Sequence, residues 1–197
     1  MTPITRRAAV LALGALAMTA AAAPSALPAK AAPSLCPGQV FAPVFSAFGD
    51  DDLYTLVPGG DFEAPSAWSG GQRVEGGEPR LGGPDAWELE LAAGPAGLAT
   101  ATSGDVCVTR DYRWLRMFAT SPSADARLRV RVAYPGGERT EAVLRGGAAS
   151  PLTPRIDLDS RRIAHPRATG TSTIRVEITA LRGVWQVDDV YVDPRMR

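Results

Sequence analysis

The chain has 197 residues, of which 45% are hydrophobic and 21% are charged, with 21 basic and 21 acidic side chains. Removing the N-terminal segment described next deletes Arg6, Arg7 and Lys30 and no acid, which leaves 18 basic against 21 acidic residues. This slightly negative balance argues against nucleic acid as a partner, because domains that bind nucleic acid concentrate positive charge.

The N-terminus has the features of an export signal. A short basic region ends in Arg6-Arg7, and residues 8–23 form an uncharged run of mainly small and apolar side chains. Ala29-Lys30-Ala31 then places small residues at the two positions that a signal peptidase reads. We therefore expect residues 1–31 to be a signal peptide, with the twin-arginine (Tat) route favoured over the general secretory route.

The remaining chain, residues 32–197, is predicted to be a single secreted domain. The apolar run of the signal is shorter than the roughly 20 residues that cross a bilayer, and no other segment approaches that length. A lipid anchor is not expected either, because Leu35, rather than a small residue, precedes Cys36. We therefore expect no membrane span in the mature protein.

Two cysteines remain after processing. An even pair in an exported protein predicts a disulfide between Cys36 and Cys107. Two free thiols are the alternative, and a metal site is disfavoured because no second pair of ligands accompanies the two cysteines. The disulfide would join the start of the mature chain to a strand near its middle.

Apolar residues alternate with polar ones along most of the mature chain, which indicates β-strands. In residues 126–134, Leu128, Val130 and Val132 alternate with arginines, and residues 173–181 repeat this pattern. The other strands are expected at residues 55–57, 87–91, 105–109, 113–119, 138–144, 155–158 and 184–192, with a further segment at Phe62. The mixed pattern of residues 113–119 suggests that both faces of that strand are covered.

About nine short strands separated by turns, with no helix of ordinary length, predict an all-β fold of antiparallel sheets packed face to face. Acidic residues in two segments of this fold need an explanation. Asp188 and Asp189 are adjacent within an apolar strand, and such carboxylates must be paired or bound to a metal. Calcium would satisfy them, because it binds carboxylate and carbonyl oxygens.

The Gly60-Asp61-Phe62-Glu63 opening and the closing Asp188-Asp189-Val190 strand resemble the jelly-roll carbohydrate-binding modules of galactose-binding-like fold. This resemblance implies a jelly-roll β-sandwich with a structural Ca²⁺ ion. The implied ligands are Glu63, one of Asp188 and Asp189, and the main-chain carbonyl of Asp61. A capped strand end, or an ion pair with arginine, is the alternative explanation for the two aspartates.

A second resemblance covers nearly the whole mature chain. Residues 43–63 and the closing Asp188-Asp189-Val190-Tyr191-Val192-Asp193 segment are similar to a group of small exported bacterial proteins without an assigned activity. This resemblance supports the fold and the compartment and adds nothing about a ligand. In the first of these segments, Asp50-Asp51-Asp52 is expected to be a solvated turn rather than a separate metal loop.

Binding of a sugar requires flat aromatic faces with hydrogen-bonding side chains beside them. Trp68, in a stretch rich in Pro, Ser and Gly, and Tyr112, at the start of a strand, are the aromatic residues expected to be exposed. Arg129 and Arg131 belong to the polar face of residues 126–134 and could bind sugar hydroxyls or carboxylates. Cross-strand ion pairs on a solvated surface are the alternative role for these arginines.

Catalysis is disfavoured by the composition. His165 is the single histidine, no Gly-x-Ser-x-Gly elbow is present, and no phosphate-binding loop opens a helix. A pair of carboxylates for glycoside cleavage cannot be judged from spacing in the sequence. We therefore expect a secreted, non-catalytic module that binds a glycan, and the alternatives are an extracellular or envelope domain that binds another protein and, less favoured, a glycan-active enzyme.

Overall fold

The computed structural model describes residues 36–65, 68–76, 85–95, 97–109, 111–137, 139–158 and 170–193. The predicted signal peptide and His165 lie outside these ranges. The described residues form one 3-10 turn, η1 (Ser46–Phe48), and thirteen strands. The strands are β1 (Thr55–Leu56), β2 (Trp68–Ser69), β3 (Gln72–Glu75), β4 (Trp87–Gly94), β5 (Gly97–Leu98), β6 (Thr100–Ser103), β7 (Val106–Thr109), β8 (Trp114–Thr120), β9 (Arg127–Ala133), β10 (Arg139–Arg145), β11 (Ile156–Asp157), β12 (Thr171–Arg182) and β13 (Val184–Asp193).

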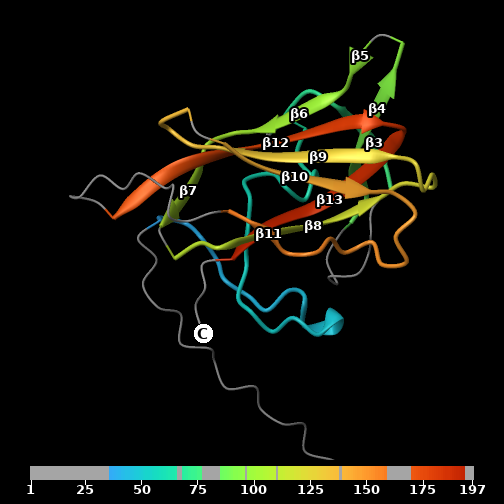
Figure 1. Cartoon of the computed structure of the whole chain (residues 1–197). Helices are drawn as coiled ribbons and strands as arrows, with labels where there is room; N and C mark the ends of the chain where they lie inside the picture. The colour runs from blue at the N-terminus through green and yellow to red at the C-terminus, as the bar shows by residue number, and fades with distance from the viewer. Residues whose placement is uncertain are drawn as a thin grey trace, which may run out of the picture. The chain divides into compact units, whose positions relative to one another are not determined.

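These strands build two antiparallel sheets that pack face to face (Figure 1). The seven-stranded sheet has the order β11-β8-β13-β4-β3, with β1 paired to β13 and β5 paired to β4. The six-stranded sheet has the order β10-β9-β12-β6-β2, with β7 paired to β12. One core of buried apolar side chains from both sheets fills the space between them. The predicted β-sandwich of jelly-roll type is thus confirmed, and no helix in the described residues is long and apolar enough to cross a membrane.

Alternation of side chains decides which face of each strand enters the core. In β9, Leu128, Val130 and Val132 are almost completely buried, whereas the three arginines between them are partly exposed. β12 repeats the pattern with Ile174, Val176 and Ile178. Because successive side chains of a strand point to opposite faces, the arginines of β9 lie on the outer side of the six-stranded sheet.

Each of the nine strands expected from the sequence is present within a few residues of its predicted bounds, whereas Phe62 lies in a turn. Four further strands, β2, β3, β5 and β6, were not expected. They are two to four residues long, and β6 consists of Thr-Ala-Thr-Ser. Such short runs of small and polar residues lack the alternation of large apolar side chains on which the expectation depended.

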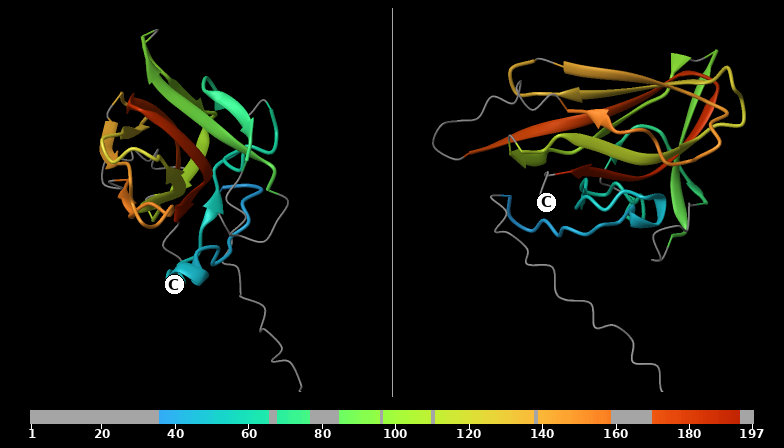
Figure 2. Two further views of the ribbon diagram at one scale, coloured as in Figure 1. Left: turned by 90° about the vertical axis from the view of Figure 1, so that its right-hand side faces the viewer. Right: turned by 60° about the horizontal axis from the view of Figure 1, so that its bottom comes forward.

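The outer side of the seven-stranded sheet is covered by the N-terminal part of the described chain (Figure 2). Phe45 and Tyr54 from this segment pack with Phe118 of β8 and with Leu152, and all four are buried. The Phe45 ring lies edge-on to the rings of Tyr54 and Phe118, with centroids 4.9 and 5.9 Å away. The prediction that both faces of residues 113–119 are covered is therefore confirmed.

The predicted disulfide joins Cys36 to Cys107, whose Cα atoms are 5.7 Å apart. Cys107 belongs to β7, which pairs with β12. The bond therefore fixes the beginning of the described chain to the six-stranded sheet, while the residues that follow it cover the other sheet.

Candidate functional site

The closing strand β13 is interrupted by an irregularity at its two aspartates. Its pairing with β8 shifts register between Asp188 and Tyr191, and Asp189 has a φ of 53°. Before the irregularity β13 pairs with β4 as far as Val187, and after it β13 pairs with β1 from Tyr191 onward. The bulge therefore lies where β13 exchanges one neighbour for another, a place where bulges redirect side chains.

The glycine-rich opening segment packs directly on this bulge. The Val190 N–H donates to the Gly60 carbonyl at 2.9 Å, and the Val57 N–H donates to the Val190 carbonyl at 2.9 Å. A Cβ atom at Gly60 would lie 2.7 Å from the Val190 carbonyl oxygen, so this approach requires glycine. The contact places Asp61 and Glu63, which follow along the chain, beside Asp189.

The two aspartates of the bulge are buried, with 1% of Asp188 and 9% of Asp189 exposed. Burial and the negative charge of Asp189 raise the pKa of Asp188 to about 9. Burial and the charges of Asp85, Asp61 and Glu63 raise the pKa of Asp189 to about 7. The charges of the predicted residues Asp61 and Glu63 thus act on Asp189, and so does the charge of Asp85, which was not predicted.

Nothing in the described chain neutralises Asp189 directly. Its carboxylate has no hydrogen bond and no ion pair with any described residue, although its N–H donates to Asp188 Oδ1 at 2.8 Å. Glu63 is held differently, because its Oε1 accepts the N–H groups of Ala86 at 2.9 Å and Trp87 at 3.0 Å. No group of three or more His, Cys, Asp or Glu side chains in the described residues is arranged to hold a metal ion. A cation here would therefore need main-chain oxygens as well as carboxylates.

The two aromatic residues expected to be exposed do not form an open platform. Tyr112 is 2% exposed and donates its hydroxyl hydrogen bond to Gln39 Oε1, so the prediction of its exposure is wrong. Trp68 is half-buried against the core, with its ring 5.3 Å from that of Phe62. Large aromatic side chains are buried whenever the fold supplies an apolar site and a partner for the polar atom, which the sequence does not reveal.

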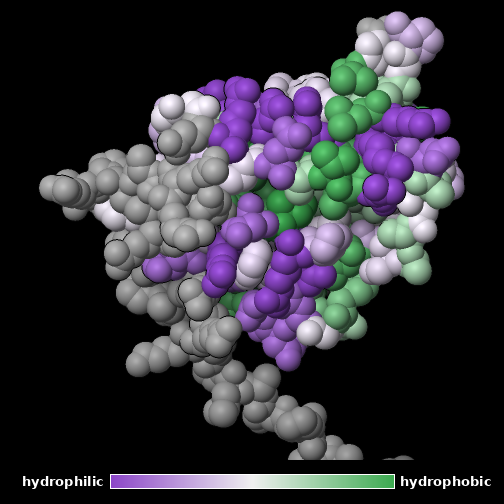
Figure 3. All heavy atoms as spheres, viewed as in Figure 1, coloured by the Kyte–Doolittle hydropathy of each residue, from purple (hydrophilic) through white to green (hydrophobic). Residues whose placement is uncertain are grey.

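The arginines of β9, in contrast, lie on the outer side of the six-stranded sheet, where antiparallel pairing lines them up with polar residues of β10 and β12. Arg129 is opposite Val143 and Thr179, and Arg131 is opposite Glu141 and Glu177. Hydrophilic and hydrophobic side chains are interspersed over these three strands in the space-filling view (Figure 3). We call this surface, formed by the outward side chains of β9, β10, β12 and β6, the outer polar face.

Ion pairs occupy part of the outer polar face, as the alternative interpretation of the arginines required. Arg131 Nη2 lies 2.9 Å from Glu141 Oε2, and its Nη1 lies 3.7 Å from Glu177 Oε2. Arg129 differs, because within the described residues its guanidinium contacts no carboxylate and makes a long hydrogen bond of 3.5 Å from Nη2 to Thr179 Oγ1. The prediction that Arg129 and Arg131 lie on one polar face is confirmed. Arg131 has two carboxylates beside it, whereas Arg129 has none within the described residues.

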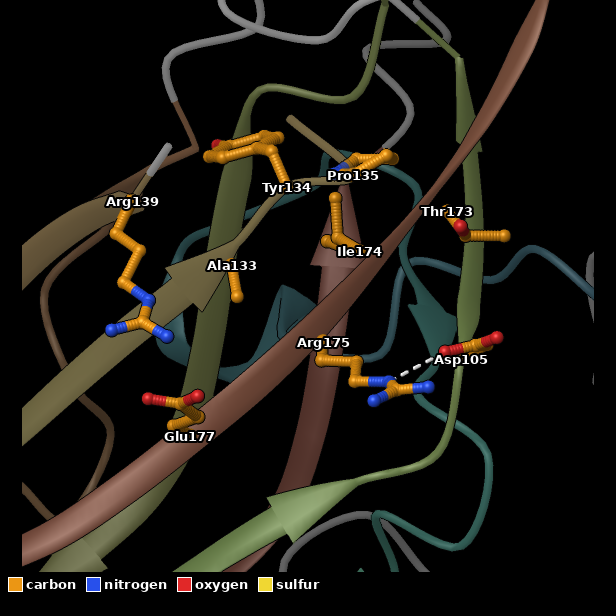
Figure 4. Close-up of a pocket in the computed structure, with 9 residues that line it drawn as sticks. All are labelled: Asp105, Ala133, Tyr134, Pro135, Arg139, Thr173, Ile174, Arg175 and Glu177. Carbon is orange, nitrogen blue, oxygen red and sulfur yellow. Dashed lines mark hydrogen bonds and ion pairs between the residues drawn. The ribbon is translucent and has the colours of Figure 1, made fainter. Parts of the chain in front are cut away.

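A hollow of about 360 Å³ opens at one end of this face. Ala133 lies between Arg139 of β10 and Arg175 of β12 in the register, and its small side chain leaves the space unfilled. Arg175 Nε donates to Asp105 Oδ1 at 2.6 Å, while Arg139 and Glu177 point toward each other on the opposite side (Figure 4). The residues lining the hollow are Asp105, Ala133, Tyr134, Pro135, Arg139, Thr173, Ile174, Arg175 and Glu177.

Sequence reasoning missed one buried charged cluster. Asp50 is 4% exposed rather than part of a solvated turn. Its carboxylate accepts hydrogen bonds from Arg116 Nη1 at 2.5 Å, Arg155 Nη2 at 2.5 Å and Tyr54 Oη at 2.7 Å. Burial alone would raise the pKa of Asp50, but the hydrogen bonds from Arg155, Tyr54 and Arg116 lower it. Because Arg155 is 105 positions away along the chain, no local pattern could have indicated this cluster.

No protein-family model matches the sequence, and no curated protein matches it. The resemblance to small exported bacterial proteins therefore finds no support here and stays a prediction. Solved structures similar to the chain include the family 11 carbohydrate-binding module of a cellulosomal cellulase from Clostridium thermocellum, at 11% identity and a TM-score of 0.45, covering 71% of this chain and 94% of that one. A family 61 carbohydrate-binding module in complex with β-1,4-galactotriose has 14% identity and a TM-score of 0.41, covering 70% and 92%.

The chain is also similar to the enzymatically active domain of tailspike protein 4 of bacteriophage CBA120, with 11% identity and a TM-score of 0.45. That match covers 68% of this chain and 20% of the tailspike chain. The chain therefore spans nearly the full length of the two carbohydrate-binding modules and about a fifth of the tailspike chain.

Proposed function

We propose that the protein is a secreted, non-catalytic module that binds a glycan on the outer polar face. The observation that carries this proposal is the arrangement of arginine, glutamate and threonine side chains in register across adjacent strands, beside a hollow of about 360 Å³. Side chains on strands keep their spacing better than side chains on loops, and a sugar presents hydroxyl groups at fixed spacing. The face is therefore suited to hydrogen bonding with a saccharide.

The carboxylates of this face do not favour glycoside cleavage. Hydrolysis uses two carboxyl groups that face each other, one of them acting as an acid and the other as a base or nucleophile. Glu141 and Glu177 lie on either side of Arg131, which forms an ion pair with each of them. The guanidinium lies between the two carboxylates, so they do not face each other across a space that a glycosidic bond could enter. Binding without catalysis is the function that this arrangement supports best.

A screen of the purified protein against immobilised polysaccharides tests the proposal. We expect binding to at least one glycan, and we expect Arg131→Ala combined with Glu177→Ala to weaken it. Glu75→Gln, on the exposed strand β3 of the other sheet, is the control and should leave binding unchanged. Absence of binding to every glycan, together with capture of a defined protein partner, would support the alternative of a protein-interaction domain.

We also propose that a structural Ca²⁺ ion binds at the bulge of β13. Glu63, one of Asp188 and Asp189, and the main-chain carbonyl of Asp61 would hold it. These donors are all oxygens, which calcium prefers. Support comes from the buried Asp189 carboxylate, which lacks a hydrogen bond or ion pair with any described residue and is surrounded by like charges. Such an ion would fasten the opening segment to the closing strand and take no direct part in sugar binding.

Thermal unfolding with and without chelator tests the calcium site. Added calcium should raise the melting temperature of chelator-treated protein. Glu63→Gln should abolish this increase while its amide oxygen keeps the hydrogen bonds to Ala86 and Trp87, whereas Glu75→Gln should retain it. A melting temperature of the parent protein that does not respond to calcium would rule the site out.

A further inference from the structure

The outer polar face carries an excess of positive charge. Strands β9, β10 and β12 together contain seven arginines and two glutamates. The whole chain, in contrast, has equal numbers of basic and acidic residues. The excess of positive charge is therefore a property of this surface and not of the chain as a whole. Such a surface favours a ligand with negative charge.

Several of these arginines already have partners within the protein. Arg131 is paired with two glutamates, and Arg175 lies 2.6 Å from Asp105. The Nη1 of Arg127 donates to the main-chain carbonyls of Ala124 and Ala126 at 3.0 and 2.7 Å. These side chains are held by the structure and do not require a ligand.

Arg129 lacks such a partner. No carboxylate of the described residues forms an ion pair with it, and its Nε is buried without a hydrogen-bond acceptor. The hydrogen bond of 3.5 Å to Thr179 Oγ1 is at the limit of what counts as a bond. A half-buried guanidinium with an unpaired N–H group is destabilising, because the N–H has lost water and gained nothing in return. An acceptor from outside cannot reach this buried Nε, but the Nη end of the partly exposed side chain also lacks a carboxylate partner among the described residues and is the part that an acid group could contact.

The neighbours of Arg129 in the register suit a sugar. Thr179 lies opposite it on β12 and is 3% exposed, and its hydroxyl is 3.0 Å from that of the exposed Thr100 of β6, so Thr100 presents the accessible hydroxyl. On the other side Val143, opposite Arg129 on β10, is 51% exposed. A cation, one accessible hydroxyl and an apolar side chain thus lie in one row, and they could contact the acid group, a hydroxyl and the C–H surface of a charged monosaccharide.

We infer that the glycan bound by the outer polar face is anionic and that Arg129 binds its acid group. The inference rests on the proposed function and names the class of sugar, one with a carboxylate or a sulfate group. A guanidinium forms two parallel hydrogen bonds with either group, which a neutral sugar cannot reproduce. Arg129 is then the residue that decides specificity, and Arg131 with its glutamates provides a fixed polar surface beside it.

Affinity electrophoresis and calorimetry with the purified protein test the inference. The probes are polygalacturonate for carboxylated sugars, a sulfated galactan for sulfated sugars, and neutral galactan and xylan. We expect binding to one of the two anionic classes to be at least about tenfold tighter than to either neutral glycan, and to weaken at high salt. Arg129→Gln should lower the affinity for the anionic glycan about tenfold.

Arg113→Gln is the matched control, because it removes one positive charge from an exposed residue next to β8, on the other sheet. It should leave the affinity unchanged, and neither variant should be markedly less stable to heat than the parent, which shows that both are folded. Equal binding of neutral and anionic glycans, with no effect of Arg129→Gln, would overturn the inference and leave the proposed function standing. Failure to bind any of the glycans, neutral or charged, would remove both.

Discussion

Asp50 and Asp189 are both buried carboxylates, but the charges around them have opposite signs. Asp50 accepts hydrogen bonds from two guanidinium groups and a tyrosine hydroxyl. Asp189 is affected instead by the negative charges of Asp85, Asp61 and Glu63. The first site is complete within the chain, whereas the second needs a proton or a cation from solution. Burial of a carboxylate therefore does not by itself indicate a binding site. The sign of the charges around the carboxylate is more informative, because negative neighbours leave it in need of a cation or a proton.

Removing the Asp50 carboxylate should have the largest effect on stability. Asp50→Ala leaves Arg116, which is 14% exposed, without its carboxylate partner in a largely buried position, although Arg116 still donates to the Thr153 carbonyl. We expect a loss of about 3 kcal/mol in the free energy of unfolding, since breaking a buried pair leaves an uncompensated charge. Urea unfolding measures the loss, and Asp51→Ala, at an exposed neighbour, is the control. A loss no greater than that of the control would show that the cluster does not stabilise the fold.

Neutralising Asp189 should have the opposite effect on stability. Asp189→Asn removes one of the mutually repelling charges and keeps a residue type that tolerates a φ of 53°. We expect the chelator-treated variant to be about 1 kcal/mol more stable than the parent at pH 8. The same variant should lose the calcium-dependent increase in melting temperature. Destabilisation in chelator would contradict the interpretation that Asp189 is an uncompensated charge.

The stability contributed by Asp189 and by Asp50 should also depend on pH in opposite directions. The pKa of Asp189 rises from its ordinary value of 3.8 to about 7, so between these values the folded state keeps a proton that the unfolded state has released. Stability of the metal-free protein should therefore fall as the pH rises through this window, and Asp189→Asn should reduce the slope. The lowered pKa of Asp50 acts in reverse, because its stabilisation is lost only as the pH falls below 3.8. Urea unfolding at several pH values with chelator measures both.

Features that depend on residues close together in the chain could be predicted from the sequence, whereas features that depend on distant residues could not. Alternation within single strands located β9 and β12, and the adjacent aspartates in an apolar strand predicted that Asp188 and Asp189 would be buried, as they are. The Asp50 cluster could not be predicted, because Arg116 and Arg155 reach it from distant parts of the chain. The lack of a carboxylate partner for Arg129 within the described residues could not be predicted either, since the alternation of β9 gives Arg129 and Arg131 the same pattern. Their difference arises from the register, which places Val143 beside one and Glu141 beside the other.

The smallest expected effect concerns the geometry of the Asp50 cluster rather than its charge. Arg155 binds Asp50 through two nitrogens, with Nη2 at 2.5 Å from Oδ1 and Nε at 3.3 Å from Oδ2, and it also lies 2.7 Å from Asp52. Lysine keeps the charge but cannot make two parallel hydrogen bonds. Because Arg155 is 40% exposed, solvent screens the pair, and Arg155→Lys should cost about 0.5 kcal/mol by urea unfolding. A loss as large as that of Asp50→Ala would mean that Arg155, and not the more buried Arg116, carries most of the stabilisation of Asp50.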